Sequence, residues 1–351
     1  MKILVTGAAG FIGFHLSRRL LNDDFEVVGL DNINNYYDTD LKYARLKKLG
    51  INSSEIVQNK ITKSSEFSKF KFIRLNLEDR TNINDLFYSE NFDIVYNLAA
   101  QAGVRHSLTN PLDYVNSNIT GFANMLEACR ETKIQHLIYA SSSSVYGLNE
   151  TIPFSTSDNV DHPINMYAAT KKTNELMAHA YSYLYKIPTT GLRFFTVYGP
   201  WGRPDMAYFL FTKSIIDKQP IRLFNEGNMK RDFTYIDDIT ECLRRIINYP
   251  PEGNQNWSGI KPDPSCSKAP YKIYNIGNSN PVHMNDFIHE IEKNLGQPAI
   301  KELYPMQPGE MNTTWANVDD LFKEIKYKPQ INIEEGVKRF IQWYKDEYSS
   351  F

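Results

Sequence analysis

The chain has 351 residues, of which 42% are hydrophobic and 23% are charged, and its formal net charge is −2. This composition is that of an ordinary globular protein, and it excludes a largely disordered chain, a collagen-like chain and a coiled coil. Because the charges are nearly balanced, no long-range field draws the protein to nucleic acid or to anionic lipid.

The three cysteines, Cys129, Cys242 and Cys266, lie far apart in the chain and form no C-x-x-C pair. We therefore expect a reducing compartment, with neither a disulfide framework nor a metal site. Met1 and Lys2 run directly into a short apolar run, without the features of a signal peptide. No apolar stretch approaches the roughly 18 residues of a membrane span. These features predict a cytoplasmic protein that does not enter a membrane.

Short apolar runs alternate with segments of helical length through residues 1–200. The runs that read as buried strands are 2–6, 26–30, 71–75, 94–98, 136–140 and 189–194, and helical segments between them include 11–21 and 113–131. Repetition of strand, helix and strand predicts a parallel sheet with helices on both faces. The predicted fold is therefore α/β, with a Rossmann-type doubly wound sheet.

Two regions depart from this alternation. A tyrosine-rich turn at 34–38 and a short predicted helix at 41–49 are followed by a polar stretch at 52–69, which we expect to be a surface excursion. Beyond residue 200 the pattern is irregular, with Pro and Gly clustered at 198–204 and 250–270, and residues 284–348 look mainly helical. We expect a smaller, irregular α/β region at the C-terminus.

Residues 6–13 read TGAAGFIG, directly after the first predicted strand and at the start of a helix. Gly7 permits a tight turn, Gly10 lets the backbone approach a pyrophosphate, and Gly13 lets helix and strand pack closely. Asp31 ends the second predicted strand, where an acid binds the adenosine ribose and disfavours a 2′-phosphate. A glycine turn alone could lack a ligand, but these features in this order predict NAD binding.

Tyr167 and Lys171 are spaced to lie on one face of a helix. A nearby ammonium and an oxidised nicotinamide would lower the tyrosine pKa from about 10. Such a tyrosine can act as a general base toward a sugar hydroxyl. A tyrosine and a lysine can occur at this spacing by chance. Serines at 141–144, however, follow a predicted strand, and side chains at that end of a strand face the ligand crevice of an α/β sheet. The set predicts a catalytic centre.

These motifs resemble those of the extended short-chain dehydrogenases/reductases, and among them the nucleotide-sugar 4-epimerases, most closely those that act on UDP-glucuronate. The general signature consists of the glycine turn, Asp31, NLAA at 97–100, Asn118 with Gly121, Ser142, Tyr167 and Lys171. The narrower signature consists of QAGVR at 101–105, YAATKK at 167–172, RFFTVYGPWGRPDM at 193–206 and KRDFTYIDD at 230–238. The resemblance extends over nearly the whole chain.

The resemblance implies roles for individual residues. Tyr167, Lys171 and Ser142 would be catalytic, and Asn118 would help to order the active-site helix. The cofactor NAD would contact Gly7, Gly10, Phe11, Ile12, Gly13, Asp31, Asn32, Asn35, Asn76, Leu77, Leu98, Ala99, Ala100, Tyr167 and Lys171. The UDP-sugar would contact Ser142, Ser143, Ser144, Thr196, Arg203, Phe224, Arg231, Arg105, Gln307 and Glu310. Asn76 stands where many relatives carry Asp, and Gln307 and Glu310 depart from the galactose-type pattern of Arg and Asp.

The implied reaction is reversible C4 epimerisation of UDP-glucuronate to UDP-galacturonate through a 4-keto intermediate. A ketone at C4 lies β to the C6 carboxylate, so the enzyme must hold that carboxylate away from the geometry of decarboxylation. Arg203 is the best candidate cation because its fork matches a carboxylate, and Arg105 is a second. Ser142, Ser143, Ser144 and Thr196 are candidate hydroxyl donors.

Other readings stay open at this point. A UDP-glucuronate decarboxylase shares the first step, and a 4-epimerase of neutral or N-acetylated UDP-hexoses shares the fold. A 4,6-dehydratase is disfavoured because those relatives carry Asp-Glu where Ser142-Ser143 stand. A non-catalytic NAD-binding regulator is remote because both Tyr167 and Lys171 are present.

The resemblance also implies an organisation for the chain. Residues 1–195 would form the NAD-binding domain, with 236–282 partly returning to the sheet, and 196–351 would mainly bind the UDP-sugar. We expect a homodimer in which helices at 113–132 and 167–186 form a four-helix interface.

Overall fold

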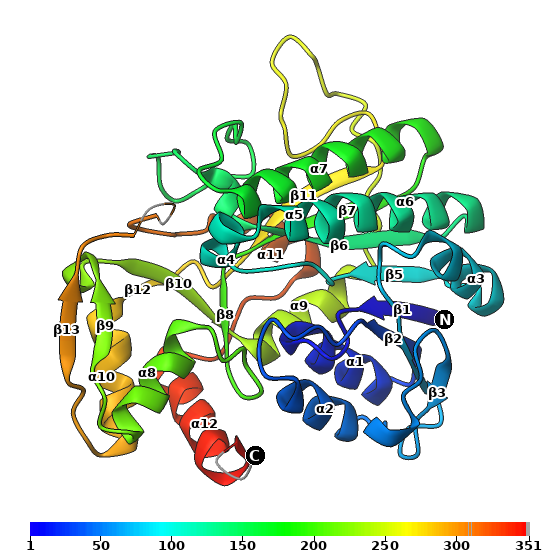
Figure 1. Cartoon of the computed structure of the whole chain (residues 1–351). Coiled ribbons are helices and arrows are strands. Elements are labelled where there is room, and N and C mark those ends of the chain that lie inside the picture. Colours follow the sequence, from blue (N-terminus) through cyan, green and yellow to red (C-terminus); the bar gives the residue numbers. More distant parts are fainter. Residues whose placement is uncertain (308, 310, 349–351) are drawn as a thin grey trace.

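The computed structural model describes residues 1–307, 309 and 311–348, and a large sheet lies at its centre (Figure 1). The strands of this sheet are β1 (Lys2–Thr6), β2 (Glu26–Asp31), β3 (Ile61–Lys63), β4 (Phe70–Arg74), β5 (Ile94–Asn97), β6 (His136–Ser142), β7 (Thr189–Phe194) and β11 (Tyr271–Ile276). Their spatial order is β11-β7-β6-β5-β1-β2-β4-β3. Neighbouring strands are parallel except β3, which is antiparallel to β4. This arrangement confirms the predicted doubly wound α/β fold.

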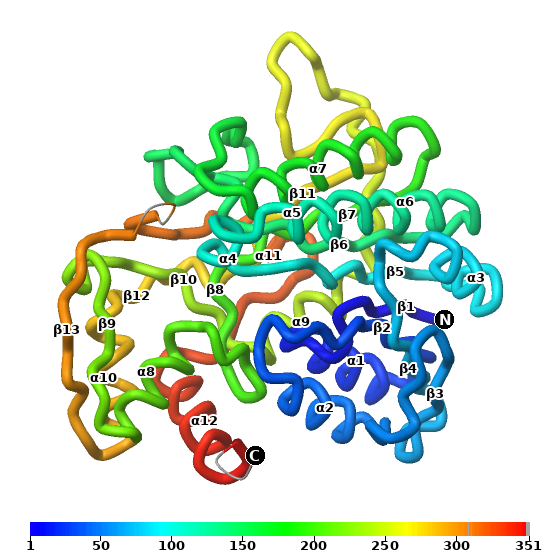
Figure 2. Tube along the Cα trace, in the orientation of Figure 1, coloured from blue at the N-terminus to red at the C-terminus, as the bar shows by residue number. Residues whose placement is uncertain are grey.

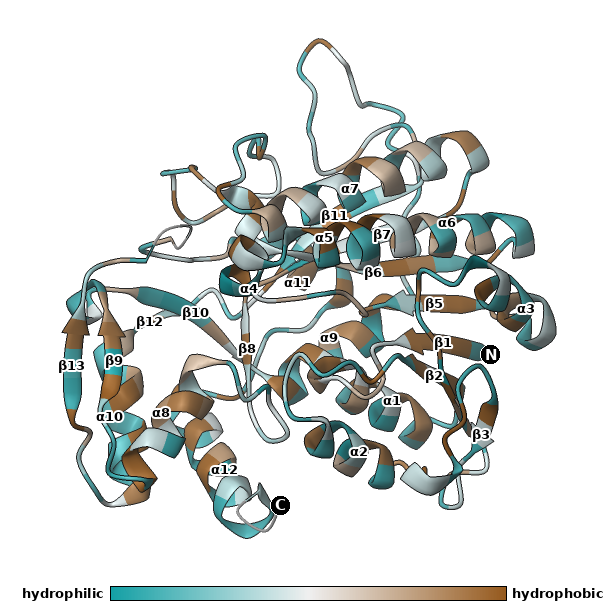
Figure 3. Ribbon diagram, in the orientation of Figure 1, coloured by the Kyte–Doolittle hydropathy of each residue, from teal (hydrophilic) through white to brown (hydrophobic). Residues whose placement is uncertain are grey.

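Helices cover both faces of the sheet. One face carries α1 (Phe11–Asn22), α2 (Thr39–Lys47) and α9 (Ile236–Ile246), and the other carries α3 (Arg80–Glu90), α6 (Gly121–Thr132) and α7 (Met166–Tyr185). Along β1, Ile3 and Val5 belong to the same hydrophobic cluster as Phe14 of α1, whereas Leu4 belongs to the cluster that contains Phe122 of α6. Successive strand residues point to opposite faces, so a strand that is apolar throughout is buried on both sides, as the brown strands of Figure 3 show.

The polar stretch at 52–69 contains short elements of regular structure. It forms a 3₁₀ turn (η1, Ser53–Glu55) and then β3, which extends the sheet at its edge. Thr62 is buried between two exposed neighbours, and the Ser64 hydroxyl donates to the carbonyl of Leu49 at 2.8 Å. Most residues of this stretch are exposed, as expected of a surface excursion. The edge strand within it was not predicted, because one buried threonine is too short a signal to indicate a strand.

The predicted continuous helix at 113–132 is divided. After α4 (Val104–Thr109), the chain forms α5 (Pro111–Tyr114), a π-helical turn (η2, Val115–Thr120) and α6. The widened turn contains Asn118, whose side chain bonds to both backbone groups of Gln101 and to Thr170. π-turns inside helices are frequent at functional sites, and this one interrupts the helix where Asn118 meets the helix that carries Tyr167.

A smaller part of the chain lies beside the carboxyl ends of the central strands (Figure 2). It contains a three-stranded sheet of β12 (Pro281–His283), β10 (Lys230–Tyr235) and β8 (Thr196–Tyr198), and a pair formed by β13 (Lys301–Tyr304) and β9 (Ile221–Phe224). Its helices are α8 (Ala207–Ile216), α10 (Met284–Leu295) and α12 (Ile333–Asp346), while α11 (Asp319–Ile325) packs beside β11. The stacked rings of Phe233 and Phe287, 4.2 Å apart, lie in its core. The predicted division into domains stays a prediction.

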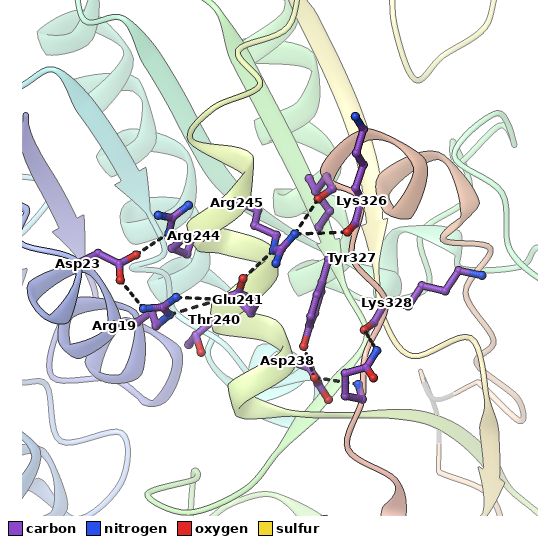
Figure 4. A network of polar contacts seen from close by, with 12 residues as sticks. Arg19, Asp23, Asp238, Thr240, Glu241, Arg244, Arg245, Lys326, Tyr327 and Lys328 are labelled. Carbon is purple, nitrogen blue, oxygen red and sulfur yellow. Dashed lines mark hydrogen bonds and ion pairs between the residues drawn. The ribbon is translucent and has the colours of Figure 1, made fainter.

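A polar network joins α1, α9 and the segment after α11 (Figure 4). Arg19 pairs with Asp23 and Glu241, and the Asp238 carboxylate accepts from the backbone of Gln330 and Ile331 at 2.9 and 3.0 Å. None of these residues lines the large cavity described below. The network therefore stabilises the helical layer. Within the described chain, no helix has the length and apolar character needed to cross a membrane.

Candidate active site

A cavity of about 1170 Å³ opens where the carboxyl ends of the central strands face the smaller part of the chain. Gly7, Asp31 and Ser142 line it on the sheet side, and Arg203 and Arg231 line it on the opposite side. Ligands in open α/β sheets bind outside the carboxyl ends of the strands. The sequence motifs are therefore expected to meet in this cavity.

The glycine turn is shaped by backbone contacts. Gly7 has φ +75°, and its N–H donates to the carbonyl of Leu30 at 2.7 Å. A Cβ on Gly13 would overlap the carbonyl oxygen of Gly7, so no other residue fits there without displacing the turn. Helix α1 begins after Gly10 with no side-chain cap and no acidic residue in its first turn. Its first N–H groups can therefore bind a phosphate.

Asp31 ties the second strand to this turn. One carboxylate oxygen accepts from the N–H of Ala9 at 3.1 Å, and the other accepts from Ile33 at 2.8 Å. The side chain is buried, and each oxygen keeps a lone pair for a ribose hydroxyl. Lys42 also lines this end of the cavity, and its ammonium lies 2.6 Å from the side-chain oxygen of Asn34. Burial lowers the pKa of Lys42, and the negative charge of Asp31 opposes that effect.

These residues fit a dinucleotide. The predicted cofactor residues that line the cavity are Gly7, Gly10, Phe11, Ile12, Gly13, Asp31, Asn32, Leu77, Leu98, Ala99, Ala100, Tyr167 and Lys171. Asn35 and Asn76 do not line it, whereas Asn34 and Glu78 do. The glycine turn and the strand end that the sequence indicated both line the cavity, but the sequence could not show which residue of each neighbouring loop lines it.

Tyr167 lies in the first turn of α7, which Asn165 caps by accepting from the N–H of Ala168 at 2.8 Å. The pKa of Tyr167 lies above its ordinary value, not below it, because burial outweighs the hydrogen bond from Ser142 and the positive charge of Arg203, which both act to lower it. We expected the ammonium of Lys171 to lower this pKa. Instead, Lys171 donates to the carbonyl of Ala140 at 2.8 Å, and burial lowers its own pKa to about 8. Ser142 and Arg203 are therefore the protein groups that favour the phenolate.

The serine turn follows β6 and continues into a 3₁₀ turn (η3, Ser143–Tyr146). The Ser142 hydroxyl accepts from the N–H of Ser144 at 3.1 Å, and both side chains line the cavity. Ser141 instead donates to Glu175 at 2.7 Å. All four serines at 141–144 line the cavity.

A buried ion pair supports this turn from behind. The Arg193 guanidinium binds both carboxylate oxygens of Glu175, at 2.8 and 3.0 Å, and also reaches the hydroxyl of Tyr146 at 3.1 Å. Because Glu175 also accepts from Ser141, the pair joins α7, β7 and the serine turn. The sequence analysis assigned no role to Glu175. Its position on the face of α7 that carries Lys171 was the available signal.

The predicted substrate residues lie on both sides of the cavity. Those that line it are Ser142, Ser143, Ser144, Thr196, Arg203, Phe224, Arg231, Arg105 and Gln307, while Glu310 lies outside the described residues. The guanidinium of Arg105 lies 4.8 Å from the ring centroid of Phe224. Arg231 donates to the carbonyl of Asn312 at 3.0 Å.

Arg203 has a partner that the sequence analysis did not assign. Its Nε donates to Asp205 at 3.0 Å, and its Nη2 donates to the second carboxylate oxygen of the same residue. The hydroxyl of Tyr36 donates to Asp205 at 3.1 Å. Asp205 lay inside the RFFTVYGPWGRPDM string and Tyr36 in the tyrosine-rich turn, so the sequence marked both segments without connecting them.

Comparisons with known proteins agree with this geometry. Residues 3–277 match the NAD dependent epimerase/dehydratase family. The chain is 53% identical over 348 residues to Protein CapI of Staphylococcus aureus, with 99% of each chain covered. It is 44% identical over 349 residues to a probable UDP-glucuronate 4-epimerase of Rhizobium meliloti, with 99% and 98% covered.

A solved structure extends the comparison to the fold. The UDP-glucuronic acid 4-epimerase from Bacillus cereus, in complex with UDP-glucuronic acid and NAD, superposes with a TM-score of 0.81 at 33% identity. The match covers 98% of this chain and 99% of that chain. This chain belongs to the NAD dependent epimerase/dehydratase family. The resemblance inferred from the motifs, and with it the dependence on NAD, is confirmed.

Proposed function

We propose that this chain is a UDP-glucuronate 4-epimerase that interconverts UDP-glucuronate and UDP-galacturonate with bound NAD. The observation that carries the proposal is the content of one cavity. A glycine turn with Asp31 lies at one end, a half-buried Tyr167 near Ser142 lies between, and Arg203 with several hydroxyls lies at the other. The names of the relatives support the same substrate.

The chain's own residues divide the work. The glycine turn and the free N–H groups of α1 hold the pyrophosphate, and Asp31 holds the adenosine ribose. When bound, NAD supplies a hydride acceptor and donor for C4 of the sugar. Tyr167 takes the O4 proton as C4 becomes a ketone and returns it afterwards, with Ser142 in hydrogen-bonding reach. Lys171 ties α7 to the carbonyl of Ala140 and so fixes where Tyr167 lies.

The remaining substrate contacts follow the lining of the cavity. The C6 carboxylate is held by Arg203 and by the hydroxyls of Ser142, Ser143, Ser144 and Thr196, which keeps the C5–C6 bond away from alignment with the ketone. Arg231, Phe224 and Gln307 contact the UDP group, which stays anchored while the sugar turns, and Arg105 is the second candidate cation for the carboxylate.

We further propose that the protein acts as a homodimer in the cytoplasm. Leu176, Ala180 and Leu184 recur on one face of α7, and all three are exposed. An exposed apolar stripe on a long helix is typical of an interface between copies. The predicted helix at 113–132 is divided by the π-turn η2, and its second part, α6, packs beside α7. Helix α6 can therefore contribute to the same interface. Sedimentation at micromolar concentration should show a dimer, and monomer alone would contradict the interface.

The experiment that tests the function is incubation of the purified protein with UDP-glucuronate, without added NAD, followed by chromatography of the products. We expect UDP-galacturonate. Release of CO2 with a UDP-pentose would identify a decarboxylase instead. Turnover of UDP-glucose or its N-acetylated analogue, but not of UDP-glucuronate, would identify a neutral-sugar epimerase. Absence of any turnover would indicate a regulator.

A further inference from the structure

Arg203 and Asp205 form an ion pair inside the cavity, where the proposed function needs a cation for a carboxylate. Two parallel hydrogen bonds join the Nε and Nη2 atoms of the guanidinium to the two carboxylate oxygens. The side chains are 24% and 29% exposed, and both residues line the cavity. Among the described residues, Nη1 of Arg203 donates no hydrogen bond, so one edge of the fork is available to a ligand.

Tyr36 fixes the carboxylate of this pair. Its hydroxyl donates to Asp205 at 3.1 Å across 169 positions of sequence. The hydroxyl lies against the backbone of Gly103, where φ is +104° and a Cβ would overlap the phenol oxygen. The ring packs edge-on against His106, with centroids 5.1 Å apart. The glycine and the two rings therefore hold a hydrogen-bond donor against the same carboxylate oxygen that accepts from Nη2 of Arg203.

The charges of this group cancel. Arg203 holds the pKa of Asp205 below its usual value, although burial acts in the opposite direction. Burial, followed by the charge of Asp205, raises the pKa of Tyr36 to about 12. At neutral pH the group therefore consists of one cation, one anion and one neutral phenol. A sugar carboxylate that approaches Arg203 meets a polarised pair with no net charge.

We propose that Asp205 is a specificity-determining residue that acts through Arg203 by balancing its charge, so that the uronate carboxylate is bound without being trapped. The proposal rests on the proposed function, because it concerns a sugar that must turn between two hydride transfers. Binding energy that is equal in the ground state and the transition state does not raise kcat. Ground-state binding that must be broken before the sugar can turn lowers kcat. An unbalanced, partly buried cation would hold the carboxylate in one orientation.

The decisive variant is Asp205→Asn. Asparagine keeps the shape and one oxygen acceptor for Arg203, while it removes the negative charge and replaces the second acceptor by an N–H donor. We expect UDP-glucuronate to bind about fivefold more tightly, as befits a charge change at a partly exposed pair. UDP-glucose, which lacks the carboxylate, should bind as before, and kcat for UDP-glucuronate should fall. If Asp205 only held Arg203 in place, UDP-glucuronate would bind more weakly, and this result would overturn the proposal.

Two further variants isolate charge from shape. Asp24→Asn makes the same substitution at an 85% exposed position beyond the end of α1, where φ is +67°. It should leave both affinities unchanged. Tyr36→Phe removes the hydrogen bond to Asp205 but no charge, so the ratio of the two affinities should also hold. If Tyr36→Phe changed that ratio as strongly as Asp205→Asn, loss of order rather than of charge would explain both, and the proposal would fail.

A measurement on the unmodified protein keeps the proposal testable if Asp205→Asn does not fold. Calorimetric affinities for UDP-glucuronate and UDP-glucose are compared between about 50 and 500 mM salt, a range over which the screening length falls severalfold. If the charges of the pair are balanced, the affinity for UDP-glucuronate relative to that for UDP-glucose should stay nearly constant as the salt concentration increases. If the cation is unbalanced, this ratio should fall. These binding results do not require turnover. The product analysis of the wild-type protein therefore tests the proposed function separately.

Discussion

The two ends of the cavity are built in different ways. At the cofactor end, the shape comes from backbone: Gly7 donates to Leu30, Gly13 lies against Gly7, and Asp31 is held by two N–H groups. At the substrate end, the shape comes from pairs of side chains, such as Arg203 with Asp205 and Arg105 over Phe224.

This difference follows from what each end must do. The pyrophosphate and ribose of a dinucleotide are constant, so a rigid backbone cradle next to a sheet suits them. A sugar that turns within its site needs donors that can be exchanged, and side chains on loops supply them. Tyr167 lies between the two ends, since α7 is anchored to the sheet while Arg203 influences its pKa. This comparison predicts that adding side-chain atoms to a glycine should damage the cofactor end. Removing a side chain should damage the substrate end.

The largest effect is expected where the two ends meet. Tyr167→Phe keeps the ring that packs edge-on against Tyr114 but removes the proton acceptor. A general base contributes about 10²–10⁴-fold, so kcat should fall by that factor while nucleotide affinity holds. Steady-state turnover of UDP-glucuronate and calorimetric binding of UDP provide the measurements. A near-native rate would remove Tyr167 from the catalytic role.

A single methyl group should break the cofactor end. Gly13→Ala places a Cβ against the carbonyl of Gly7, and overpacking of a rigid site costs about 1–3 kcal/mol. The wild-type protein should purify with NAD(H) bound, and the variant should contain far less, as measured in the supernatant after denaturation. Gly259→Ala is the matched control, because its Cβ would meet only the Trp257 ring at 3.8 Å. Full NAD content in Gly13→Ala would show that the turn can yield.

The same contrast decides what the sequence could predict. Gly7, Gly13 and Asp31 are informative because their roles depend on local backbone, which short motifs encode. The order of the central strands follows from the alternation of apolar runs and helices. The contact between Tyr36 and Asp205 spans 169 positions, and no local pattern indicates it.

Smaller errors have the same origin. The π-turn η2 keeps the apolar spacing of a helix on either side, so periodicity at 113–132 could not reveal the extra residue around Asn118. The edge strand β3 depends on pairing with β4, and its own residues carry almost no apolar signal. Tyr167 shows how little the sequence says about pKa values. Tyr167 and Lys171 lie in one helix as predicted, but the groups that favour the phenolate of Tyr167 are Ser142 of β6 and Arg203.

Removal of one side chain should damage the substrate end selectively. Arg203→Ala should weaken binding of UDP-glucuronate by about 1.5–3 kcal/mol, the range for a hydrogen bond to a charged group. UDP-glucose should lose much less, because it offers no carboxylate to the guanidinium. Calorimetry with both nucleotides, combined with an assay for released CO2, measures the affinity and the protection of the 4-keto intermediate. Equal losses for the two nucleotides would place Arg203 against the UDP group instead.

The smallest expected effect concerns pH and tests whether the substrate end reaches the catalytic hydroxyl. The charge of Arg203 favours the phenolate of Tyr167 and so lowers its pKa. Arg203→Gln removes that charge, and the pKa of Tyr167 should rise. Because the phenolate is the base, kcat increases with pH through this pKa, so the rising limb of the profile should move to higher pH.

The matched control for this shift is Arg245→Gln, which makes the same substitution on α9 in the network of Figure 4, away from the cavity lining. Its profile should coincide with that of the wild type. Both profiles are measured at saturating nucleotide, so that the weaker binding of Arg203→Gln does not enter kcat. A rising limb that does not move would mean that Arg203 binds the sugar without influencing Tyr167, and one that moves to lower pH would contradict the attraction between Arg203 and the phenolate. The two ends of the cavity would then be electrostatically independent, and the pKa of the base would depend on Ser142 and the bound cofactor.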